Sequence, residues 1–386
     1  MKILNMSDLS STGGAAIAGN RISDALRTNG AEVIQLSSDG RNTKEQRALF
    51  NGNKFSALHN LLSPFFLASY AKSLIDNNLN HQLRKFLQQE RFDVINIHNL
   101  HSAGWPISLV GTALEFAPVV WTLHDCWSFL GTFHSSHCDL PSNYSKRKLN
   151  RFWKSLELKN FKNSLAAATP SAWMRDQAFS SYWSDYILKT IHNPVPKSFF
   201  ELLDRESCKK ALGLSLKQPT VLCIAGNLNE EMKGGPLLKE MLNSDAKDYC
   251  QFFLIGEGNQ FNDPKIKRLG FLKDELTLRI AYNAADILLH PAQIDNLPNT
   301  VAESMSCGTP ILAFNTGGLS EMVISDKSGW LVDKLNSEEM ILKIKDILKS
   351  KSYQNLRLTS QQYSKSIFDH NEVGKEYNKL FQNLLS

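Results

Sequence analysis

The chain has 386 residues, which is enough for two domains of ordinary size. Apolar residues make up 42% and charged residues 21%, proportions typical of a folded globular protein, so we do not expect a disordered chain. The net charge of +5 is unevenly placed, because residues 1–200 hold 21 Lys+Arg against 14 Asp+Glu, whereas residues 201–386 hold 22 against 24. No run of about 18 apolar residues occurs, and Met1-Lys2 leads straight into a short strand-like run without a signal-peptide pattern, so we expect a cytosolic protein.

Short apolar runs alternate with amphipathic segments along the whole chain, which favours an α/β fold with parallel sheets and crossover helices. In the first half the expected strands are Lys2–Met6, Val33–Leu36, Val94–Ile97, Val119–Leu123 and Leu165–Thr169. In the second half they are Thr220–Ala225, Phe252–Ile255, Ile287–His290 and Ile311–Phe314. Two such sets predict two doubly wound, Rossmann-like domains, and the prolines of Ile191–Pro196 mark a hinge between them.

Gly13 and Gly14 follow the first expected strand and precede a helix expected from about Ala16 to Asn29. Glycines at such a place let the backbone approach a ligand closely, and the helix N-terminus favours an anion. An ordinary tight turn explains the pair equally well. The loop lacks the G-x-G-x-x-G fingerprint, which disfavours a Rossmann oxidoreductase.

Several histidines follow strands of the first half. His98 and His101 come after the strand that ends at Ile97, and His124-Asp125 come after Val119–Leu123. Because the carboxyl ends of parallel strands meet at one edge of a sheet, these side chains are candidates for a ligand site there. A histidine that only holds its own loop by a hydrogen bond is the structural alternative.

Cys126, His134, His137 and Cys138 lie close together in the sequence and raise the question of zinc. His137 and Cys138 are adjacent, and the spacing is not that of a known ribbon or finger, so we expect no metal. The six cysteines contain no CxxC and no framework of even spacings, which predicts reduced thiols.

Basic and aromatic side chains are interleaved over residues 146–162, a stretch of helical character. Such a helix can lie on an anionic membrane surface, and the apolar segment 61–68 can assist it. A solvated basic helix with its aromatic side chains in the core is the alternative. No nucleic-acid module occurs, so a nucleic-acid partner is not expected.

The run from Asp295 to Glu303 carries most of the functional information, because it places two carboxylates eight residues apart. Asp295 is expected in the loop after the strand Ile287–His290, and Glu303 inside the helix that follows Pro298. Backbone N–H groups of Asn296 and Leu297 and the helix N-terminus favour a phosphate there. An anion grip with two carboxylates for vicinal hydroxyls suits a nucleotide sugar, although Asp295 as a helix cap and Glu303 as a solvated residue remain the structural alternative.

That run resembles the E-x7-E signature of family 4 of the retaining glycosyltransferases, with Asp295 in place of the first Glu, and the resemblance covers essentially the whole chain. It implies the GT-B fold, in which two Rossmann-like domains face each other across a cleft. Residues 1–195 would form the acceptor-binding domain, residues 196–369 the nucleotide-sugar domain, and the helix within 370–386 would pack back on the first domain. Thr122–Trp127 and the Asp-Asn-Leu-Pro-Asn-Thr-Val version of the motif resemble bacterial enzymes of capsule, exopolysaccharide and O-antigen synthesis.

The resemblance also implies roles for individual residues. His124 would contact the donor sugar near the scissile bond, and Lys233 would neutralise the diphosphate, whereas Asn227 stands where family members usually carry an Arg. His98 and His101 would line the acceptor side, and Gly270-Phe271 would contact the nucleobase through the backbone. We therefore expect catalytic roles for His124, Asp295 and Lys233, and donor binding by Gly13, Gly14, Asn227, Lys233, Gly270, Phe271, Asp295, Asn296, Leu297, Asn299, Thr300 and Glu303.

The resulting hypothesis is a retaining hexosyltransferase that uses a nucleotide diphosphate sugar, with UDP favoured, and a lipid-linked saccharide or other glycan hydroxyl. No D-x-D triplet occurs, so we expect no metal and no other cofactor. A polyprenyl-diphosphate acceptor would place the enzyme at the inner face of the plasma membrane. Two alternatives remain open: a nucleotide-sugar 2-epimerase of the same fold, and a nucleotide-sugar-binding module without turnover.

Overall fold

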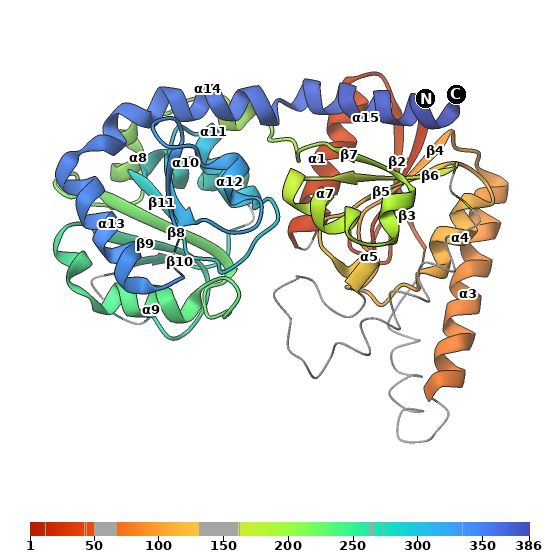
Figure 1. Cartoon of the computed structure of the whole chain (residues 1–386), viewed down its shortest axis with the longest axis horizontal. Coiled ribbons are helices and arrows are strands. Elements are labelled where there is room, and N and C mark those ends of the chain that lie inside the picture. Colours follow the sequence, from red (N-terminus) through yellow and green to blue (C-terminus); the bar gives the residue numbers. More distant parts are fainter. Residues whose placement is uncertain are drawn as a thin grey trace. The chain divides into compact units, whose positions relative to one another are not determined.

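The structure is a computed structural model of the chain, and it describes all residues except 12, 42, 44, 50–67, 131–160, 162, 262, 264, 265, 273 and 334. The chain forms two compact units (Figure 1). The N-terminal unit consists of residues 1–194 and 370–386, and the C-terminal unit consists of residues 195–369. One helix of the chain ends at Phe368, and the next begins at His370.

The N-terminal unit is built on a seven-stranded, all-parallel sheet with the order β3-β2-β1-β4-β5-β6-β7. Its strands are β1 (Lys2–Met6), β2 (Glu32–Ser37), β3 (Gln46–Ala48), β4 (Val94–Ile97), β5 (Val119–Thr122), β6 (Leu165–Thr169) and β7 (Ile187–Thr190). Its helices are α1 (Gly14–Thr28), α3 (Ala68–Gln89), α4 (Ser108–Leu114), α5 (Trp127–Leu130), α7 (Ala172–Phe179), the short 3-10 helix η3 (Tyr182–Asp185) and α15 (His370–Leu385).

Both faces of this sheet are covered, which explains why its central strands are apolar throughout. Successive side chains of a strand point to opposite faces. Ile3 of β1 accordingly packs with residues of α1 and α15, whereas Leu4 packs with residues of α3 and α4 on the other face. Figure 1 shows α15, in dark blue, running alongside the N-terminal unit. The C-terminal segment of the chain is therefore part of the N-terminal core.

The C-terminal unit has a six-stranded parallel sheet with the order β10-β9-β8-β11-β12-β13. Its strands are β8 (Thr220–Asn227), β9 (Gln251–Glu257), β10 (Lys267–Leu269), β11 (Ile287–His290), β12 (Ile311–Phe314) and β13 (Gly329–Val332). Its helices are α8 (Arg205–Ala211), α9 (Gly235–Asn243), α10 (Glu275–Ala284), α11 (Asn299–Ser306), α12 (Leu319–Met322), α13 (Ser337–Ser350) and α14 (Arg357–Phe368), with the 3-10 turns η4 (Lys197–Phe200), η5 (Asp245–Asp248) and η6 (Ser352–Leu356).

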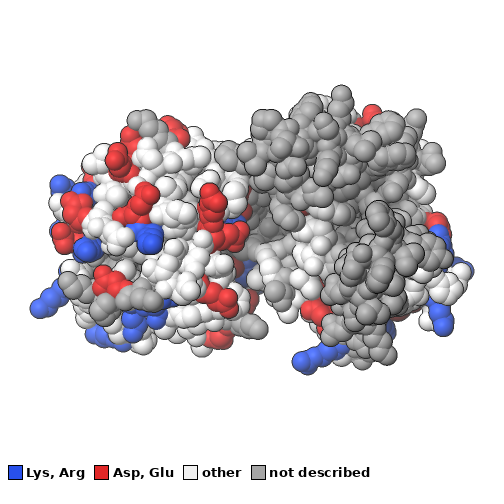
Figure 2. All heavy atoms as spheres, turned by 90° about the horizontal axis from the view of Figure 1, so that it is seen from below, with Lys and Arg blue, Asp and Glu red and all other residues white. Residues whose placement is uncertain are grey.

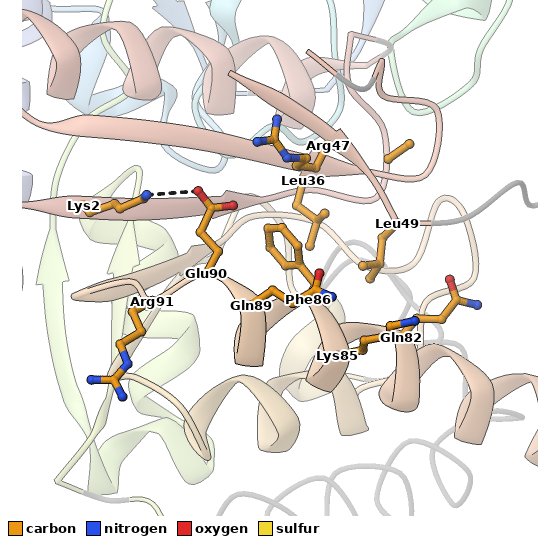
Figure 3. Close-up of a pocket in the computed structure, with 11 residues that line it drawn as sticks. Lys2, Leu36, Arg47, Leu49, Gln82, Lys85, Phe86, Gln89, Glu90 and Arg91 are labelled. Carbon is orange, nitrogen blue, oxygen red and sulfur yellow. Dashed lines mark ion pairs between the residues drawn. The ribbon is translucent and has the colours of Figure 1, made fainter. Parts of the chain in front are cut away.

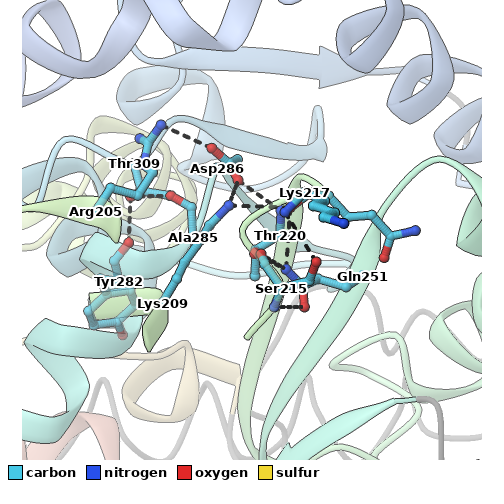
Figure 4. Close-up of polar contacts among 11 residues, drawn as sticks. Arg205, Lys209, Ser215, Lys217, Thr220, Gln251, Tyr282, Ala285, Asp286 and Thr309 are labelled. Atoms are coloured by element: carbon cyan, nitrogen blue, oxygen red, sulfur yellow. Dashed lines mark hydrogen bonds and ion pairs between the residues drawn. The ribbon is translucent and has the colours of Figure 1, made fainter. Parts of the chain in front are cut away.

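A buried ion network ties α8 to the amino ends of β8 and β11 (Figure 4). Lys209 Nζ lies 2.7 Å from Asp286 Oδ2, and Arg205 Nη1 lies 3.0 Å from Asp286 Oδ1. The backbone N–H of Thr220 donates to the same carboxylate at 2.8 Å. Because Asp286 immediately precedes β11, this network fixes the strand at the end opposite to its carboxyl terminus. We assign it a structural role.

Candidate active site

The carboxyl ends of β4 and β5 bring two predicted histidines into contact. His98 Nδ1 lies 2.9 Å from His124 Nε2, and the two rings are stacked with centroids 5.2 Å apart. His98 is buried, with 2% of its surface exposed. Burial lowers the pKa of His98 well below its ordinary value and lowers the pKa of His124 to about 4. Both rings are therefore neutral near pH 7.

His101 belongs to a second group at the same edge of the sheet. Its Nε2 lies 2.7 Å from Asp125 Oδ2, while Asp125 Oδ1 accepts the backbone N–H of Trp127 at 2.8 Å. Asp8, which follows β1, is also buried there, and its Oδ2 accepts the backbone N–H of Ala103 at 2.7 Å. Burial raises the pKa of the Asp8 carboxyl. Asp8 was not among the predicted site residues, although its position two residues after a strand is the same signal that selected the histidines.

Gly13 and Gly14 stand at the start of α1 in the N-terminal unit. Gly13 occupies the N-cap position and Gly14 is the first helical residue. The backbone N–H of Ile17 donates to the Gly13 carbonyl at 3.1 Å, which begins the helical hydrogen-bond pattern. The glycine loop and helix N-terminus thus follow β1 as predicted, with the helix starting slightly earlier.

In the C-terminal unit, three side chains meet beyond the carboxyl ends of β8 and β11. Lys233 Nζ lies 2.7 Å from Asp295 Oδ2, and His290 Nε2 lies 3.5 Å from the same oxygen. Asp295 lies in the loop between β11 and α11, as expected. His290, the last residue of β11, was not among the predicted site residues. Its strand is so apolar that the sequence indicates a core position for it.

The electrostatics of this group are dominated by the lysine and the carboxylate. Burial alone would raise the pKa of Asp295, but Lys233 and His290 outweigh it and hold the pKa well below the ordinary value. For Lys233, burial lowers the pKa, yet the neighbouring Asp295 carboxylate raises it overall. The pair is therefore an ammonium and a carboxylate at neutral pH. Lys233 keeps 38% of its side chain exposed, whereas Asp295 keeps 16%.

Close backbone contacts fix the loops that carry these groups. Gly234 has φ +79°, and a Cβ there would lie 1.9 Å from the carbonyl oxygen of Pro291. Gly317 has φ +57°, and a Cβ there would lie 1.9 Å from the carbonyl oxygen of Asp295, which also accepts the N–H of Gly318 at 3.0 Å. Residues with side chains can adopt neither conformation cheaply and would collide with backbone. The glycines therefore set where Lys233 and Asp295 lie.

Glu303 lies inside α11, as predicted, but it is not solvated. It is 5% exposed, and its Oε2 accepts the phenolic O–H of Tyr282 at 2.7 Å. Tyr282 comes from α10, and sequence reasoning did not single it out because it lies within an ordinary apolar helix face. Glu303 is held by Tyr282, whereas Asp295 contacts Lys233 and His290. The two carboxylates are therefore positioned by different residues.

The remaining predicted donor-site residues occupy loops and helix starts of the C-terminal unit. The N–H of Asn296, expected to face a phosphate, donates here to Asp295 Oδ1 at 3.0 Å. Leu297 is 6% exposed and packs in the core. Asn299 and Thr300 are the first residues of α11, Asn227 ends β8, and Gly270-Phe271 follow β10 with Phe271 52% exposed.

Comparison with known proteins decides the family. The family described as Glycosyltransferase Family 4 matches residues 12–199, and the family described as Glycosyl transferases group 1 matches residues 218–350. The chain belongs to glycosyltransferase family 4. The expectation that it is a glycosyltransferase is thereby confirmed.

A relative from Escherichia coli K12 is named "Putative colanic acid biosynthesis glycosyl transferase WcaC". It is 25% identical to this glycosyltransferase over 337 residues, which cover 80% of each chain. Among solved structures, sucrose-phosphate synthase from Thermosynechococcus elongatus aligns with TM-score 0.75 at 16% identity over 99% of this chain and 98% of its own. HepE from Anabaena in complex with UDP aligns with TM-score 0.70 at 16% identity, and the alignment covers 99% of this chain and 100% of HepE. These likenesses confirm the GT-B fold with its Rossmann-like domains.

The zinc question concerns residues that lie mostly outside the described part of this glycosyltransferase. His134, His137 and Cys138 are not among the described residues, whereas Cys126 is buried. Among the residues that the structure describes, no group of three or more His, Cys, Asp or Glu side chains is placed to hold a metal ion.

A hollow of about 950 Å3 lies elsewhere in the N-terminal unit, between α3 and the strands β1 to β3 (Figure 3). Lys2, Arg47, Lys85 and Glu90 contribute to its lining, and Lys2 is held by Glu90 at 3.0 Å. Its lining includes none of the predicted site residues. A second cavity is lined by His98, His124 and their neighbours, with a volume of about 10 Å3, close to the space of one water molecule.

The predicted membrane segments 146–162 and 61–68 also lie outside the described residues, except for Phe161 and Ala68. Within the described ranges, the structure contains no helix long and apolar enough to span a bilayer. Figure 2 shows acidic and basic side chains interspersed over the visible face of the C-terminal unit.

Proposed function

We propose that this glycosyltransferase transfers a hexosyl group from a nucleotide diphosphate sugar, with UDP favoured, to a glycan hydroxyl in surface polysaccharide biosynthesis. We propose further that transfer proceeds with retention, without a metal ion, and onto a lipid-linked saccharide. The relative named for colanic acid biosynthesis and the UDP bound to HepE support the product class and the donor base. The acceptor and its lipid would place the enzyme at the inner face of the plasma membrane.

The contact between Lys233 and Asp295 carries the proposal. These residues are 62 positions apart in the sequence, and the fold brings them to 2.7 Å at one edge of the sheet. The ammonium of a partly exposed lysine is suited to the negative charge that develops on a departing diphosphate. Asp295 positions that ammonium and can accept hydrogen bonds from sugar hydroxyls. A lysine in this role supplies the positive charge that a metal supplies in other transferases.

The other predicted residues take complementary roles. Glu303, anchored by Tyr282, would bind the ribose hydroxyls, and the start of α11 at Asn299 would face the diphosphate. In the N-terminal unit, neutral His124 would contact the transferred sugar, and the Gly13-Gly14 loop and His101 would serve donor and acceptor binding.

UDP binding tests the donor assignment. We expect calorimetric titration of UDP into the full-length protein to show binding that weakens by about tenfold or more, or about 1.4 kcal/mol, in Lys233→Met. Lys239→Met is the matched control, because Lys239 is an exposed lysine of α9 in the same unit. Equal affinity of Lys233→Met and wild type would refute the role of Lys233.

Turnover separates transfer from the alternatives. With UDP-glucose alone, slow hydrolysis should release α-glucose before mutarotation, as one-dimensional proton NMR can follow, and EDTA should not change the rate. Release of β-glucose would contradict retention, and loss of activity in EDTA would contradict the metal-free mechanism. A 2-epimerised sugar would favour the epimerase, whereas binding without any turnover would favour the binding module.

A further inference from the structure

A line of buried polar side chains connects the C-terminal helix to the histidine pair of the N-terminal unit. Tyr377 of α15 has its hydroxyl 3.2 Å from Thr122 Oγ1, and Thr122 Oγ1 lies 3.1 Å from Asn96 Oδ1. Asn96 Nδ2 lies 3.1 Å from His98 Nε2, and His98 Nδ1 lies 2.9 Å from His124 Nε2. Tyr377, Thr122 and Asn96 are each 0% exposed.

The direction of the first hydrogen bond in this line, between Tyr377 and Thr122, follows from the protonation state of the Tyr377 phenol. Burial raises the pKa of Tyr377, so the phenol is neutral and carries one O–H. Within the described part of the chain, Thr122 Oγ1 is its hydrogen-bond partner. Tyr377 must therefore donate to Thr122, because the opposite direction would leave a buried O–H without an acceptor there. The Thr122 proton is then directed to Asn96 Oδ1.

The same direction passes through the amide to both rings. With Oδ1 of Asn96 accepting, its Nδ2 is the donor that faces His98 Nε2. A neutral imidazole whose Nε2 accepts a hydrogen bond carries its proton on Nδ1. His98 Nδ1–H then donates to His124 Nε2, and the proton of neutral His124 lies on Nδ1 by the same rule.

We propose that Tyr377, Thr122 and Asn96 are positioning residues that hold His98 and His124 as Nδ1–H tautomers, so that His124 offers its substrate an N–H donor. The inference rests on the proposed role of His124 in sugar transfer. An Nδ1–H donor binds a sugar oxygen and does not accept the proton of the attacking hydroxyl. The helix α15, which ends the chain, thereby sets the chemistry of a residue beyond the carboxyl end of β5.

Histidine nitrogen NMR tests the tautomers directly and does not depend on activity. In the full-length protein labelled with 15N-histidine, long-range proton–nitrogen spectra at pH 7.5 should show ten rings. The signals of His98 and His124 are assigned from His98→Gln and His124→Gln. Both rings should show a protonated Nδ1 and an unprotonated Nε2. A protonated Nε2 on either ring would overturn the proposal.

Replacement of the amide by a carboxylate gives the sharpest variant. In Asn96→Asp both oxygens of the new side chain accept hydrogen bonds, so the carboxylate cannot donate to His98, and His98 should gain a proton on Nε2. We expect kcat to fall by about tenfold or more, while the KM for the donor changes by less than about twofold. If His98 Nε2 stays unprotonated in Asn96→Asp, the line of hydrogen bonds from Tyr377 to His124, which we call the relay, does not set the tautomers and the proposal is overturned.

Two further comparisons separate a relay from simple packing. Thr122→Ser keeps the hydroxyl and should retain the wild-type tautomers, whereas Thr122→Val should show a mixture. Phe381→Leu alters the packing of α15 next to Tyr377 and should leave both the tautomers and kcat unchanged. If the tautomers switch in Asn96→Asp while kcat does not change, the relay stands and the proposed role of His124 in transfer falls.

Discussion

His124 has a pKa of about 4 in the folded chain, because burial disfavours its charged form. The ordinary value of 6.5 applies when the chain unfolds. Between these two values the unfolded state binds more protons than the folded state, so folding stability rises with pH. The contribution is fully present above pH 6.5 and is lost as the pH falls toward 4. Burial depresses the pKa of His98 in the same direction.

We therefore predict that the free energy of unfolding of the N-terminal unit falls on acidification below pH 6.5, with a slope approaching about 1.4 kcal/mol per pH unit for His124 alone. Urea denaturation at about pH 4.5, 5.5 and 6.5 measures how the free energy of unfolding depends on pH. His124→Gln should flatten the slope, whereas His81→Gln, at an exposed position of α3, should leave it unchanged. A wild-type slope in His124→Gln would show that this ring is not the group responsible.

The residues that sequence reasoning found and missed differ in what surrounds them. Lys233, Asp295 and Glu303 are charged residues next to apolar runs, and such positions stand out in a sequence. His290 and Tyr282 were missed because each lies inside an apolar element, where a buried core residue is the expected interpretation. His290 belongs to the candidate site because it contacts Asp295, and Tyr282 because it donates to Glu303. The sequence does not reveal these contacts, because they depend on how different elements pack together.

At the scale of elements, the Asp295 loop is held by the loop that follows β12. The Gly317-Gly318 turn after β12 lies against the Asp295 backbone, with the Gly318 N–H donating to its carbonyl at 3.0 Å. Gly317 has φ +57°, and its missing Cβ leaves room for that carbonyl. Changes to this turn should therefore act on donor binding although the turn itself bears no charged group.

We predict that Gly317→Ala displaces the Asp295 loop and weakens UDP binding by about tenfold, or about 1.4 kcal/mol, since the added Cβ would lie 1.9 Å from a backbone oxygen. It should also lower stability by about 1–3 kcal/mol through backbone strain. Gly226→Ala is the matched control, because a Cβ there meets nothing within 4 Å. UDP affinity and thermal denaturation measure the two effects. Equal UDP affinity of Gly317→Ala and wild type would show that the turn does not position Asp295.

The strands that the sequence predicted are the inner ones, and those it missed are the edges. All nine expected strands are present, with small differences in their ends. Among the described residues, four additional strands, β3, β7, β10 and β13, stand at the edges of the two sheets. Inner strands are buried on both faces and read as continuous apolar runs. An edge strand such as β7, with alternating exposed and half-buried residues, has no such run, and its pairing depends on a neighbour already in place.

At the scale of the whole molecule, the chain closes its first unit with its last helix. Val373, Tyr377, Leu380 and Phe381 of α15 are buried among side chains of α1 and of the central strands of the N-terminal sheet. Asn29 Nδ2 at the end of α1 also donates to the carbonyl of Asn371 at 3.2 Å. The N-terminal unit therefore cannot complete its core until residues 370–386 have been synthesised.

We predict that Phe381→Ala lowers the free energy of unfolding of the N-terminal unit by about 3–5 kcal/mol, the cost of removing a buried aromatic side chain. Phe381 is 0% exposed, whereas Leu385 on the same helix is 49% exposed. Leu385→Ala should therefore change stability by less than about 0.5 kcal/mol. Urea denaturation followed by tryptophan fluorescence measures both, because Trp121 and Trp183 are buried in this unit. Similar losses in the two variants would mean that α15 is not docked on the N-terminal core, and the Tyr377 contact with Thr122 would fall with it.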